Sequence, residues 1–445
     1  MAHDNPQADT AFVGHTLLLS PCWRETAAST GGPAMKPRAV SRRRFLAQSA
    51  ATALGLSAFS YRRVLGANQR VVMGIIGSGG RGRGLMQIFL KAKTCPVEFA
   101  GVCDVYEANL VQGMQIAGTR AKNYEDYREL LANRDIQAVI IATPDHWHHR
   151  QLLDALDAGK DVYLEKPMSW SIEQGLEMVS ATRRSKQIVQ VGMQRRSAPL
   201  VLEALQVVRE GTLGEVNIAR AQWFWNMLPL VKNRQLKGRL NWQQFCGPAG
   251  PQPLDRGEYK NVSFLNWRYF WAFSGGNMTD QGTHLMDVIQ WFLNDGQPPR
   301  AAVCYGQVYR LQPSETPDTF CAVFEYPKFL ATWTLAYTNS YQDGWKIILQ
   351  GNNATLELDN DGYRVYPDPG RGGKPLAASQ QKSGSLPSEP HVENFLECIH
   401  SRRQPNAPVE VGHNAVLAPH LANLAYKYAT RAVLRPDGKV VFAQG

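Results

Sequence analysis

Three side chains that can exchange protons are spaced along one predicted helix. Asp280, His284 and Asp287 lie four and three positions apart, at the start of an apolar-periodic segment that continues to Leu293. Helical spacing of this kind lines side chains up on one face, so we expect a carboxylate to orient or polarise the imidazole. Imidazole titrates near neutral pH and suits reversible proton transfer to a hydroxyl group. The alternative is an aspartate cap beside a histidine that only packs.

A glycine-rich loop earlier in the chain has the pattern of a phosphate-binding turn. It follows residues 71–76, a short apolar run typical of a strand buried on both faces. Gly77 allows a tight turn, Gly79 lets the backbone approach a pyrophosphate, and Gly82 permits close packing of the following helix on the strand. The loop consists of Gly77, Ser78, Gly79, Gly80, Arg81 and Gly82.

An acidic residue stands where such a loop needs one. A second apolar run, residues 97–102, leads to Asp104, 22 residues beyond Gly82. Strand, loop, helix, strand and acid in this order are typical of a dinucleotide-binding unit. The carboxylate would accept hydrogen bonds from the adenosine ribose and repel a 2′-phosphate, and Val105 and Tyr106 add no arginine to attract one. We therefore expect NAD rather than NADP, with helix capping as the alternative role of Asp104.

Two further buried strands end in polar loops. Residues 138–142 lead into the loop 143–149, and residues 161–164 lead into Glu165 and Lys166. Open parallel sheets bind ligands at the carboxyl ends of their strands, so we expect both loops at the ligand. The loop 143–149 contains three histidines without a distant partner of ligand spacing, and no metal site is predicted.

These ordered motifs resemble those of the Gfo/Idh/MocA family, which includes glucose–fructose oxidoreductase and inositol dehydrogenase. The matching stretches are GSGGRG, CD, TPDHWHH and EKP in the first half and D-x-G-x-H in the second. The resemblance extends roughly from Arg70 to the C-terminus. It implies an α/β Rossmann domain with a doubly wound parallel sheet, followed by an α+β domain with a large open, mainly antiparallel sheet that carries substrate and dimer contacts.

The resemblance also implies roles for residues of the catalytic centre. The lysine of EKP, here Lys166, reaches the nicotinamide and the substrate. The histidine of D-x-G-x-H, here His284, is the acid–base residue, and Asp280 is its substrate-binding neighbour.

Further positions follow from the same match. His148 is expected beside the nicotinamide ribose, whereas His146 and His149 are expected at the surface. Arg195 lies in a stretch that resembles one lining the family's cleft, where it would bind hydroxyls or an acidic substituent of the substrate. A solvated arginine is the alternative there. The predicted cofactor contacts are completed by Thr143, Pro144, Glu165 and Lys166.

The second half of the chain alternates between apolar and polar residues, as half-buried strands do. Such strands are expected at 215–225, 300–310, 318–326, 329–338, 345–351 and 354–359. A polar loop is expected at 370–388 and a helix from His413 to about Arg431. Flat aromatic faces suit pyranose stacking, with core packing as the alternative. The aromatic residues concerned are Trp223, Trp225, Trp242, Trp267, Tyr269 and Trp271.

The segment before the first strand resembles a twin-arginine export signal. Arg42, Arg43 and Arg44 stand directly before the apolar stretch 47–59. A stable membrane-spanning helix needs about 20 residues, so this stretch is too short for a permanent span. We predict export to the periplasm by the twin-arginine machinery, with Met35 as the start. Residues 65–67 match a processing site weakly, and an uncleaved, tethering leader is the alternative.

Five segments result from these assignments. Residues 1–34 are expected to form a non-native or disordered extension, and residues 35–69 are expected to form the signal and linker. Residues 70–192 form the NAD-binding domain, and 193–412 the substrate and dimerisation domain. Residues 413–445 form a C-terminal helix and tail.

Composition excludes several classes of function. The chain has 445 residues and a net charge of +10, but residues 1–69 hold eight Lys or Arg against three Asp or Glu. The remaining charge is spread without basic runs, so nucleic-acid binding is not expected. Seven scattered cysteines lack the CxxC spacing of a zinc site or redox pair, and most are expected to be buried. In an exported protein, two of these cysteines could form a disulfide, and the sequence does not select the pair.

These features predict an oxidoreductase that moves a hydride between NAD and a secondary alcohol of a sugar, cyclitol or glycoside. The periplasm lacks a free NAD pool, so we expect the cofactor to be tightly bound. A homo-oligomer formed through the C-terminal sheet is also expected. The alternatives are a glycoside hydrolase that oxidises its substrate transiently with no net redox change, and a secreted dinucleotide-binding protein without catalysis.

Overall fold

The computed structural model describes residues 70–443 of the chain. Several predictions fall outside the described residues. They concern the N-terminal extension, Met35, the twin-arginine motif with its apolar stretch and the processing site at 65–67. Among the helices within 70–443, none combines the length and the apolarity needed to cross a membrane.

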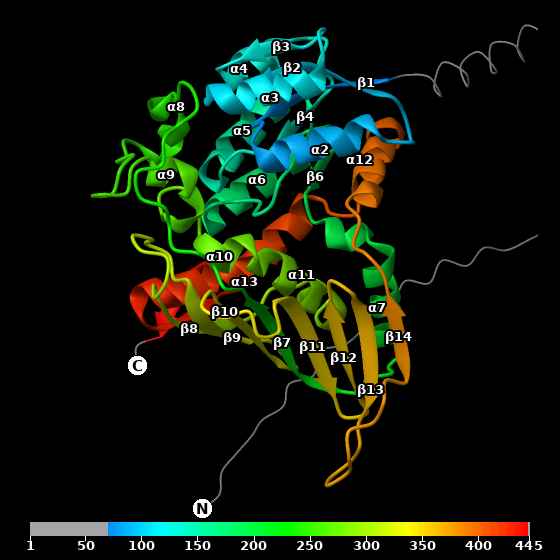
Figure 1. The fold of residues 1–445 in the computed structure, drawn as a ribbon. Coiled ribbons are helices and arrows are strands. Elements are labelled where there is room, and N and C mark those ends of the chain that lie inside the picture. Colours follow the sequence, from blue (N-terminus) through cyan, green and yellow to red (C-terminus); the bar gives the residue numbers. More distant parts are fainter. Residues whose placement is uncertain (1–69, 444–445) are drawn as a thin grey trace, which may run out of the picture. The chain divides into compact units, whose positions relative to one another are not determined.

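The first sheet has six parallel strands in the order β3-β2-β1-β4-β5-β6 (Figure 1). Its apolar runs are buried on both faces because helices cover both: α2, α3 and α12 on one, and α4, α5 and α6 on the other. The prediction of a doubly wound parallel sheet is confirmed. The strands are β1 Val71–Ile76, β2 Val97–Cys103, β3 Lys122–Tyr124, β4 Ala138–Ile141, β5 Asp161–Leu164 and β6 Val189–Val191.

Most helices of this layer follow the carboxyl end of a strand of the first sheet, whereas α12 comes from the last part of the chain. They are α2 Gly80–Leu90, α3 Glu107–Ala117, α4 Tyr127–Ala132, α5 Asp145–Asp157, α6 Ile172–Arg184 and α12 Glu389–Ser401.

The second sheet has ten strands in the order β14-β13-β12-β11-β7-β10-β9-β8-β15-β16. All neighbours are antiparallel except β7 and β10, so the predicted mainly antiparallel sheet is confirmed. The strands are β7 Val216–Phe224, β8 Ala301–Gln307, β9 Thr319–Glu325, β10 Leu330–Ala336, β11 Gly344–Gly351, β12 Ala354–Asp359, β13 Gly362–Pro367, β14 Gln380–Ser383, β15 Arg431–Leu434 and β16 Val440–Ala443.

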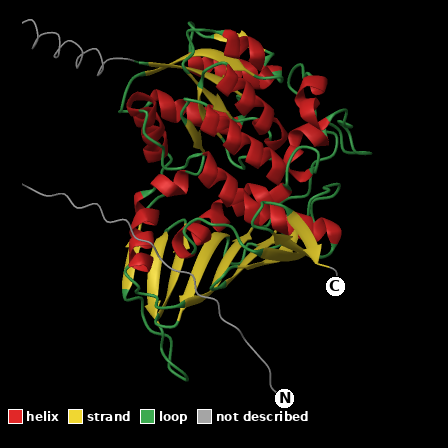
Figure 2. Ribbon diagram, turned by 180° about the vertical axis from the view of Figure 1, so that it is seen from behind, coloured by secondary structure: helices red, strands yellow, loops and turns green. Residues whose placement is uncertain are grey.

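Helices cover one face of this sheet and lie between it and the first sheet (Figure 2). They are the 3₁₀ turn η1 Gln194–Ser197, α7 Pro199–Arg209, α10 Gly276–Asp280, α11 Gly282–Leu293 and α13 Val409–Tyr428. Helix α13 also contacts α6 and β6 of the first layer.

The six predicted strands of the second half correspond to β7–β12, but four further strands were not predicted. Among them, β14 lies inside the predicted loop 370–388 and pairs with β13. Its residues are all exposed at the sheet edge, so they show no apolar alternation from which a strand can be recognised.

Residues 228–275, which we call the crossing segment, leave the second sheet after β7 and pack on the carboxyl edge of the first. Their elements are α8 Trp242–Cys246, η2 Gly247–Ala249, α9 Val262–Leu265 and η3 Trp267–Tyr269. In Figure 1, α8 and α9 stand beside the first layer. Tyr106 forms a β-bridge with Leu240, and Phe245, Phe270 and Phe273 belong to a separate apolar cluster. Sequence periodicity did not predict this arrangement.

Candidate active site

A cavity of about 510 Å³ lies at the carboxyl edge of the first sheet, above the glycine loop. The loop needs its glycines: at φ +89°, Gly77 would place a Cβ 2.7 Å from the oxygen of Ala142, and a Cβ on Gly82 would overlap the oxygen of Gly77. Helix α2 begins at Gly80, so its N-terminal N–H groups point to this cavity and favour an anion. The geometry fits the pyrophosphate of a dinucleotide.

Asp104 lines the same cavity just after β2 and ties the loop to the sheet. Its carboxylate accepts hydrogen bonds from the backbone N–H of Ser78 at 2.8 Å and of Tyr106 at 2.9 Å. Burial raises the pKa of Asp104 to about 6, although these hydrogen bonds oppose the shift. The capping alternative is wrong, because the N-cap of α3 is Tyr106. Thr143 and Pro144 also line this cavity, whereas the predicted cofactor contacts His148, Glu165 and Lys166 do not.

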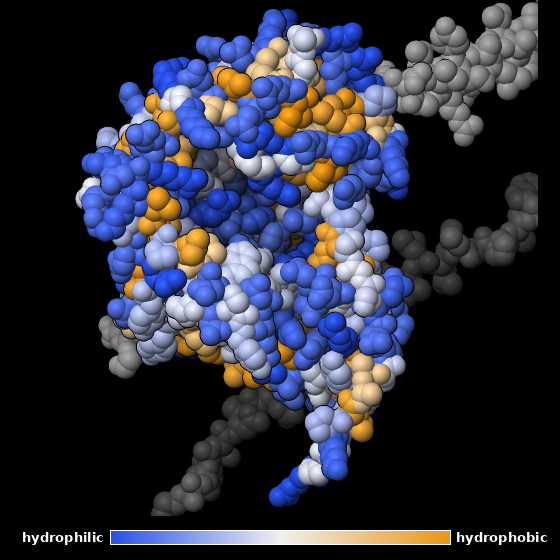
Figure 3. Space-filling view, in the orientation of Figure 1, coloured by the Kyte–Doolittle hydropathy of each residue, from blue (hydrophilic) through white to orange (hydrophobic). Residues whose placement is uncertain are grey.

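A second cavity, of about 380 Å³, adjoins the first and shares Arg81, Thr143, Trp267 and Arg268 with it. It lies between the two sheet layers, where the space-filling view shows a recess lined largely by hydrophilic residues (Figure 3). We call it the substrate cavity. Its polar lining includes Asp145, Glu165, Lys166, Asn277 and Asp280, and its aromatic lining is Trp225, Trp267, Tyr269 and Tyr337.

Lys166 and Asp280 meet across this cavity from different layers. The Lys166 ammonium donates to Asp280 Oδ1 at 2.7 Å and to the Asp280 backbone oxygen at 2.9 Å. Arg268 Nε lies 3.3 Å from the other carboxylate oxygen. Burial alone would raise the pKa of Asp280, but the charges of Lys166 and Arg268 outweigh it and lower the pKa to about 2. Asp280 is therefore an ionised anchor that holds two cations.

Glu165 supports the glycine loop from beneath the substrate cavity. Its carboxylate accepts from Arg81 Nε at 2.7 Å, and Glu165 itself is 4% exposed. Arg81 lines both cavities, so this pair links the loop after β5 to the loop after β1.

His284 is buried behind the substrate cavity and is not oriented by a carboxylate. The expected alignment with Asp280 and Asp287 is wrong, because Asp280 turns to Lys166 and Asp287 holds Arg196 in a two-pronged ion pair. The helix is also interrupted between α10 and α11. Burial and the nearby Lys166 charge hold the pKa of His284 well below its usual value. Within residues 70–443 its Nδ1 has no hydrogen-bond partner.

Two of the three histidines after β4, His146 and His149, are less exposed than predicted. His148 bridges two loops, with Nδ1 2.7 Å from the oxygen of Pro167 and Nε2 2.9 Å from the oxygen of Thr143. The surface prediction for His146 is wrong: it is 3% exposed, and its Nε2 lies 2.9 Å from the oxygen of Phe245, because the crossing segment covers it. His149 is half-buried and contacts Glu177.

Arg195 is buried, so the solvated alternative is wrong. Its guanidinium lies 3.8 Å from the centre of the Trp345 ring, and burial lowers its pKa to about 9. In the described part of the chain, its Nη1 has no partner. Arg195 is absent from the lining of both cavities, so the structure does not bring it to the predicted substrate contact.

Some of the aromatic residues singled out in the sequence line the substrate cavity, and others pack against protein side chains. Trp225, Trp267 and Tyr269 line the substrate cavity, whereas Trp242 stacks on Phe245 inside the crossing segment. Trp223 packs edge-on against Trp225, and Trp271 carries the Lys427 ammonium on its face.

Two charged residues of the substrate cavity were not predicted. Arg268 comes from a part of the crossing segment without a recognisable motif. Asp145 lies inside the TPDHWHH stretch, directly before the first of its three histidines. The available signal for Asp145 was its position directly after a buried strand.

Both parts of the chain match known protein families. Residues 71–193 match the family described as "Oxidoreductase family, NAD-binding Rossmann fold", and residues 253–357 match the "GFO/IDH/MocA C-terminal domain". An inositol 2-dehydrogenase/D-chiro-inositol 3-dehydrogenase of Shouchella clausii is 33% identical over 154 residues, 34% of this chain and 43% of that protein. A glycosyl hydrolase family 109 protein of Shewanella sp. ANA-3 is 29% identical over 33% of each chain. The chain thus matches less than half the length of either relative.

Solved structures share the fold over most of the described chain. The WlbA dehydrogenase from Bordetella pertussis, solved with NADH and UDP-GlcNAcA, has a TM-score of 0.63 at 18% identity, covering 82% of this chain and 99% of its own. A levoglucosan dehydrogenase solved with NADH and levoglucosan has a TM-score of 0.62 at 16% identity, with the same coverage. With its NAD-binding Rossmann domain and its matching C-terminal domain, this chain belongs to the Gfo/Idh/MocA family of oxidoreductases.

Proposed function

We propose that the protein oxidises a secondary alcohol of a carbohydrate, with NAD in the first cavity and the sugar in the second. The observation that carries this proposal is the Lys166–Asp280 pair in a cavity that directly adjoins the glycine-loop cavity. NAD, when bound, supplies the hydride acceptor. Lys166 Nζ donates a hydrogen bond to the alcohol oxygen, Asp280 keeps Nζ in place, and uncharged His284 accepts the hydroxyl proton. The aromatic lining packs on sugar C–H faces.

The test is a survey of free sugars, cyclitols and glycosides with the purified protein, following the absorbance of NADH. We expect NADH to form with at least one compound that carries a secondary alcohol, together with a ketone product. A protein that binds NAD but leaves it oxidised with every compound would contradict the proposal.

A second candidate is glycoside hydrolysis through transient oxidation, and the family 109 relative favours considering it. Here the oxidised sugar would lose its glycosidic substituent by elimination, add water and take the hydride back. Cleavage of a glycoside without net NADH supports this reaction, whereas accumulation of a ketosugar supports simple dehydrogenation. The intact Lys166–Asp280 pair disfavours the third candidate, a binding protein without catalysis.

The crossing segment gives a physical reason to expect that the cofactor is retained. The cavity above the glycine loop, which we call the cofactor cavity, is lined by four residues of this segment: Arg234, Phe245, Phe264 and Trp267. The segment is fastened to the rim by Glu125, which pairs with Arg239 and accepts from Asn241 Nδ2 at 2.6 Å. Backbone bonds join Glu107 N to Arg239 O and Asn241 N to Val105 O. A dinucleotide beneath this segment leaves only when some of these contacts open.

The Arg239→Ala variant should release NAD about two- to fivefold faster than wild type, because an exposed ion pair makes only a small contribution. Arg239 does not line the cavity, so the change acts through the fastening alone. Stopped-flow dilution of NADH-loaded protein measures the rate. The control is Lys237→Ala, which removes a neighbouring cation of the same segment. Equal release from the two variants and wild type would contradict the retaining role.

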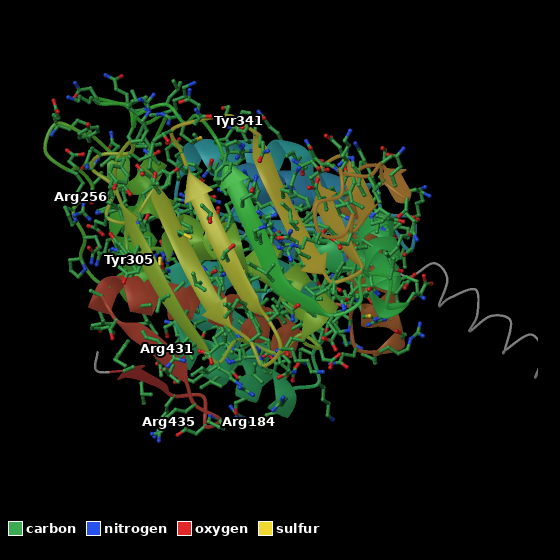
Figure 4. The ribbon with its side chains drawn as sticks, turned by 90° about the horizontal axis from the view of Figure 1, so that it is seen from below. Arg184, Arg256, Tyr305, Tyr341, Arg431 and Arg435 are labelled. Atoms are coloured by element: carbon green, nitrogen blue, oxygen red, sulfur yellow. The ribbon has the colours of Figure 1, made fainter. Side chains whose placement is uncertain are left out.

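We further propose export by the twin-arginine machinery to the periplasm, a role in carbohydrate metabolism, and a homo-oligomer formed through the second sheet. The face of this sheet opposite the helices carries apolar residues toward solvent: Tyr305, labelled in Figure 4, is 82% exposed, Leu330 48% and Ile218 38%. Light scattering with a Tyr305→Glu variant tests the oligomer.

A further inference from the structure

The substrate cavity contains a further buried carboxylate besides that of Asp280. Asp145 is the first residue of α5, is 2% exposed and lines the cavity together with Lys166 and Asp280. Its Oδ2 accepts a hydrogen bond from Ser274 Oγ at 2.8 Å. Within residues 70–443, Ser274 is the one side chain that donates a hydrogen bond to the Asp145 carboxylate, and no salt bridge includes Asp145.

Asp145 and Asp280 share one cavity but differ in environment. Asp280 is held by two cations, which lower its pKa to about 2. Burial raises the pKa of Asp145; the groups that face it are His148 on its own helix, Arg268 of η3, Asp280 of α10 and the Ser274 hydroxyl. When surroundings push two carboxyl groups apart in this way, they take different roles in proton transfer. The Asp145 carboxylate is the stronger base of the two.

We infer that Asp145 is a second proton-transfer group of the active site, which removes a proton from the substrate carbon next to the oxidised carbon. This inference rests on the proposed function, because only oxidation makes that C–H bond acidic. In the step, the C–H bond breaks, its proton goes to the Asp145 carboxylate, and its electron pair forms a C=C bond. The carbonyl oxygen becomes an enolate oxygen, stabilised by the Lys166 ammonium. No net electron transfer occurs.

The need for such a base separates the two candidate reactions. Dehydrogenation requires one hydride acceptor and one acceptor for the hydroxyl proton, and His284 has the second role in the proposed function. Elimination of a glycosidic substituent requires a further base, because the leaving oxygen departs from a carbon two bonds from the carbonyl carbon. Asp145 therefore points to the transient-oxidation reaction on a glycoside.

A structural role for Asp145 makes a different prediction. An aspartate in the first turn of α5 also stabilises the helix and fixes the loop that carries Ser274. The Asp145→Asn variant separates the roles, since the amide oxygen still accepts from Ser274 but is not a base. Asp154→Asn is the matched control on the same helix; Asp154 binds Tyr127 and Arg150 and does not line the substrate cavity.

The experiment follows deuterium from D₂O into methyl 3-keto-α-D-glucopyranoside by NMR. We expect wild type and Asp154→Asn to exchange the proton at carbon 2, and Asp145→Asn to do so at least about 100-fold more slowly. Hydride transfer is measured as NADH formed in a single turnover with a panel of 4-nitrophenyl hexosides. The Asp145→Asn variant should slow hydride transfer far less than it slows deuterium exchange. In wild type, exchange should fall as the pH drops through the raised pKa of Asp145, and Asp145→Asn should lose this dependence.

The outcomes are distinguishable. Exchange by Asp145→Asn at the wild-type rate overturns the inference, and so does an equal loss of exchange and hydride transfer. Wild type that forms NADH from a glycoside but exchanges no deuterium also overturns it, while the proposed function stands. Wild type that neither reduces bound NAD nor exchanges deuterium overturns the proposed function, and the inference with it. Thermal unfolding of each variant shows whether the fold is retained.

Discussion

The Lys166→Ala variant is expected to transfer hydride about 10³-fold more slowly than wild type, as for the loss of one preorganised donor to an oxygen that develops negative charge. The variant loses the ammonium that lies 2.7 Å from Asp280 and faces the substrate cavity. It should keep its bound nucleotide, because Lys166 does not line the cofactor cavity. Single-turnover formation of NADH with the best substrate measures the rate, and mass spectrometry of the nucleotide checks retention.

Chemical rescue provides the control for this prediction. Ethylamine fits the space left by the truncated side chain and can replace the amine, so it should raise the rate of Lys166→Ala but not of wild type. A Lys166→Ala variant with a rate close to wild type on every substrate would contradict the catalytic assignment.

The Asp280→Asn variant is expected to be less stable by about 2 kcal/mol at neutral pH, besides losing activity. The pKa of Asp280 is lowered from 3.8 to about 2, and each pKa unit corresponds to about 1.4 kcal/mol. A lowered carboxyl pKa stabilises the fold at pH values above the unfolded-state pKa, and this contribution is lost as the pH falls through the folded-state value. The deficit of the variant should therefore shrink between about pH 4 and pH 2.

Thermal unfolding of both proteins across this pH window measures the effect. The control is Asp255→Asn, since Asp255 forms an exposed ion pair with Lys260 and contributes little. A constant difference between Asp280→Asn and wild type at all pH values would show that the charge of Asp280 does not stabilise the fold.

The first half of the chain was predictable because its signals are local. Buried parallel strands are continuous apolar runs, and β1 and β5 have the predicted bounds. The glycine loop was recognisable for the same reason, since the tight turn and the close approach of backbone at Gly77 and Gly82 leave no room for a side chain.

The wrong predictions concern contacts between distant segments. Helical spacing aligned Asp280 with His284, but it carried no information on Lys166 and Arg268, which arrive from other elements and hold the carboxylate more strongly than an uncharged imidazole can. His146 was expected at the surface because the crossing segment, which buries it, has no periodic pattern.

The sequence by itself determined the bounds of β1 and β5, the phosphate-binding loop, the acid at Asp104 and the identity of Lys166 and Asp280 as candidates. Each depends on neighbouring residues or on a spacing that the backbone geometry sets. Only the tertiary structure decided which carboxylate holds Lys166, that His284 is uncharged, and that Asp145 faces the substrate cavity. Charge and burial at these positions depend on side chains more than 100 residues away in the chain, whose approach no local pattern records.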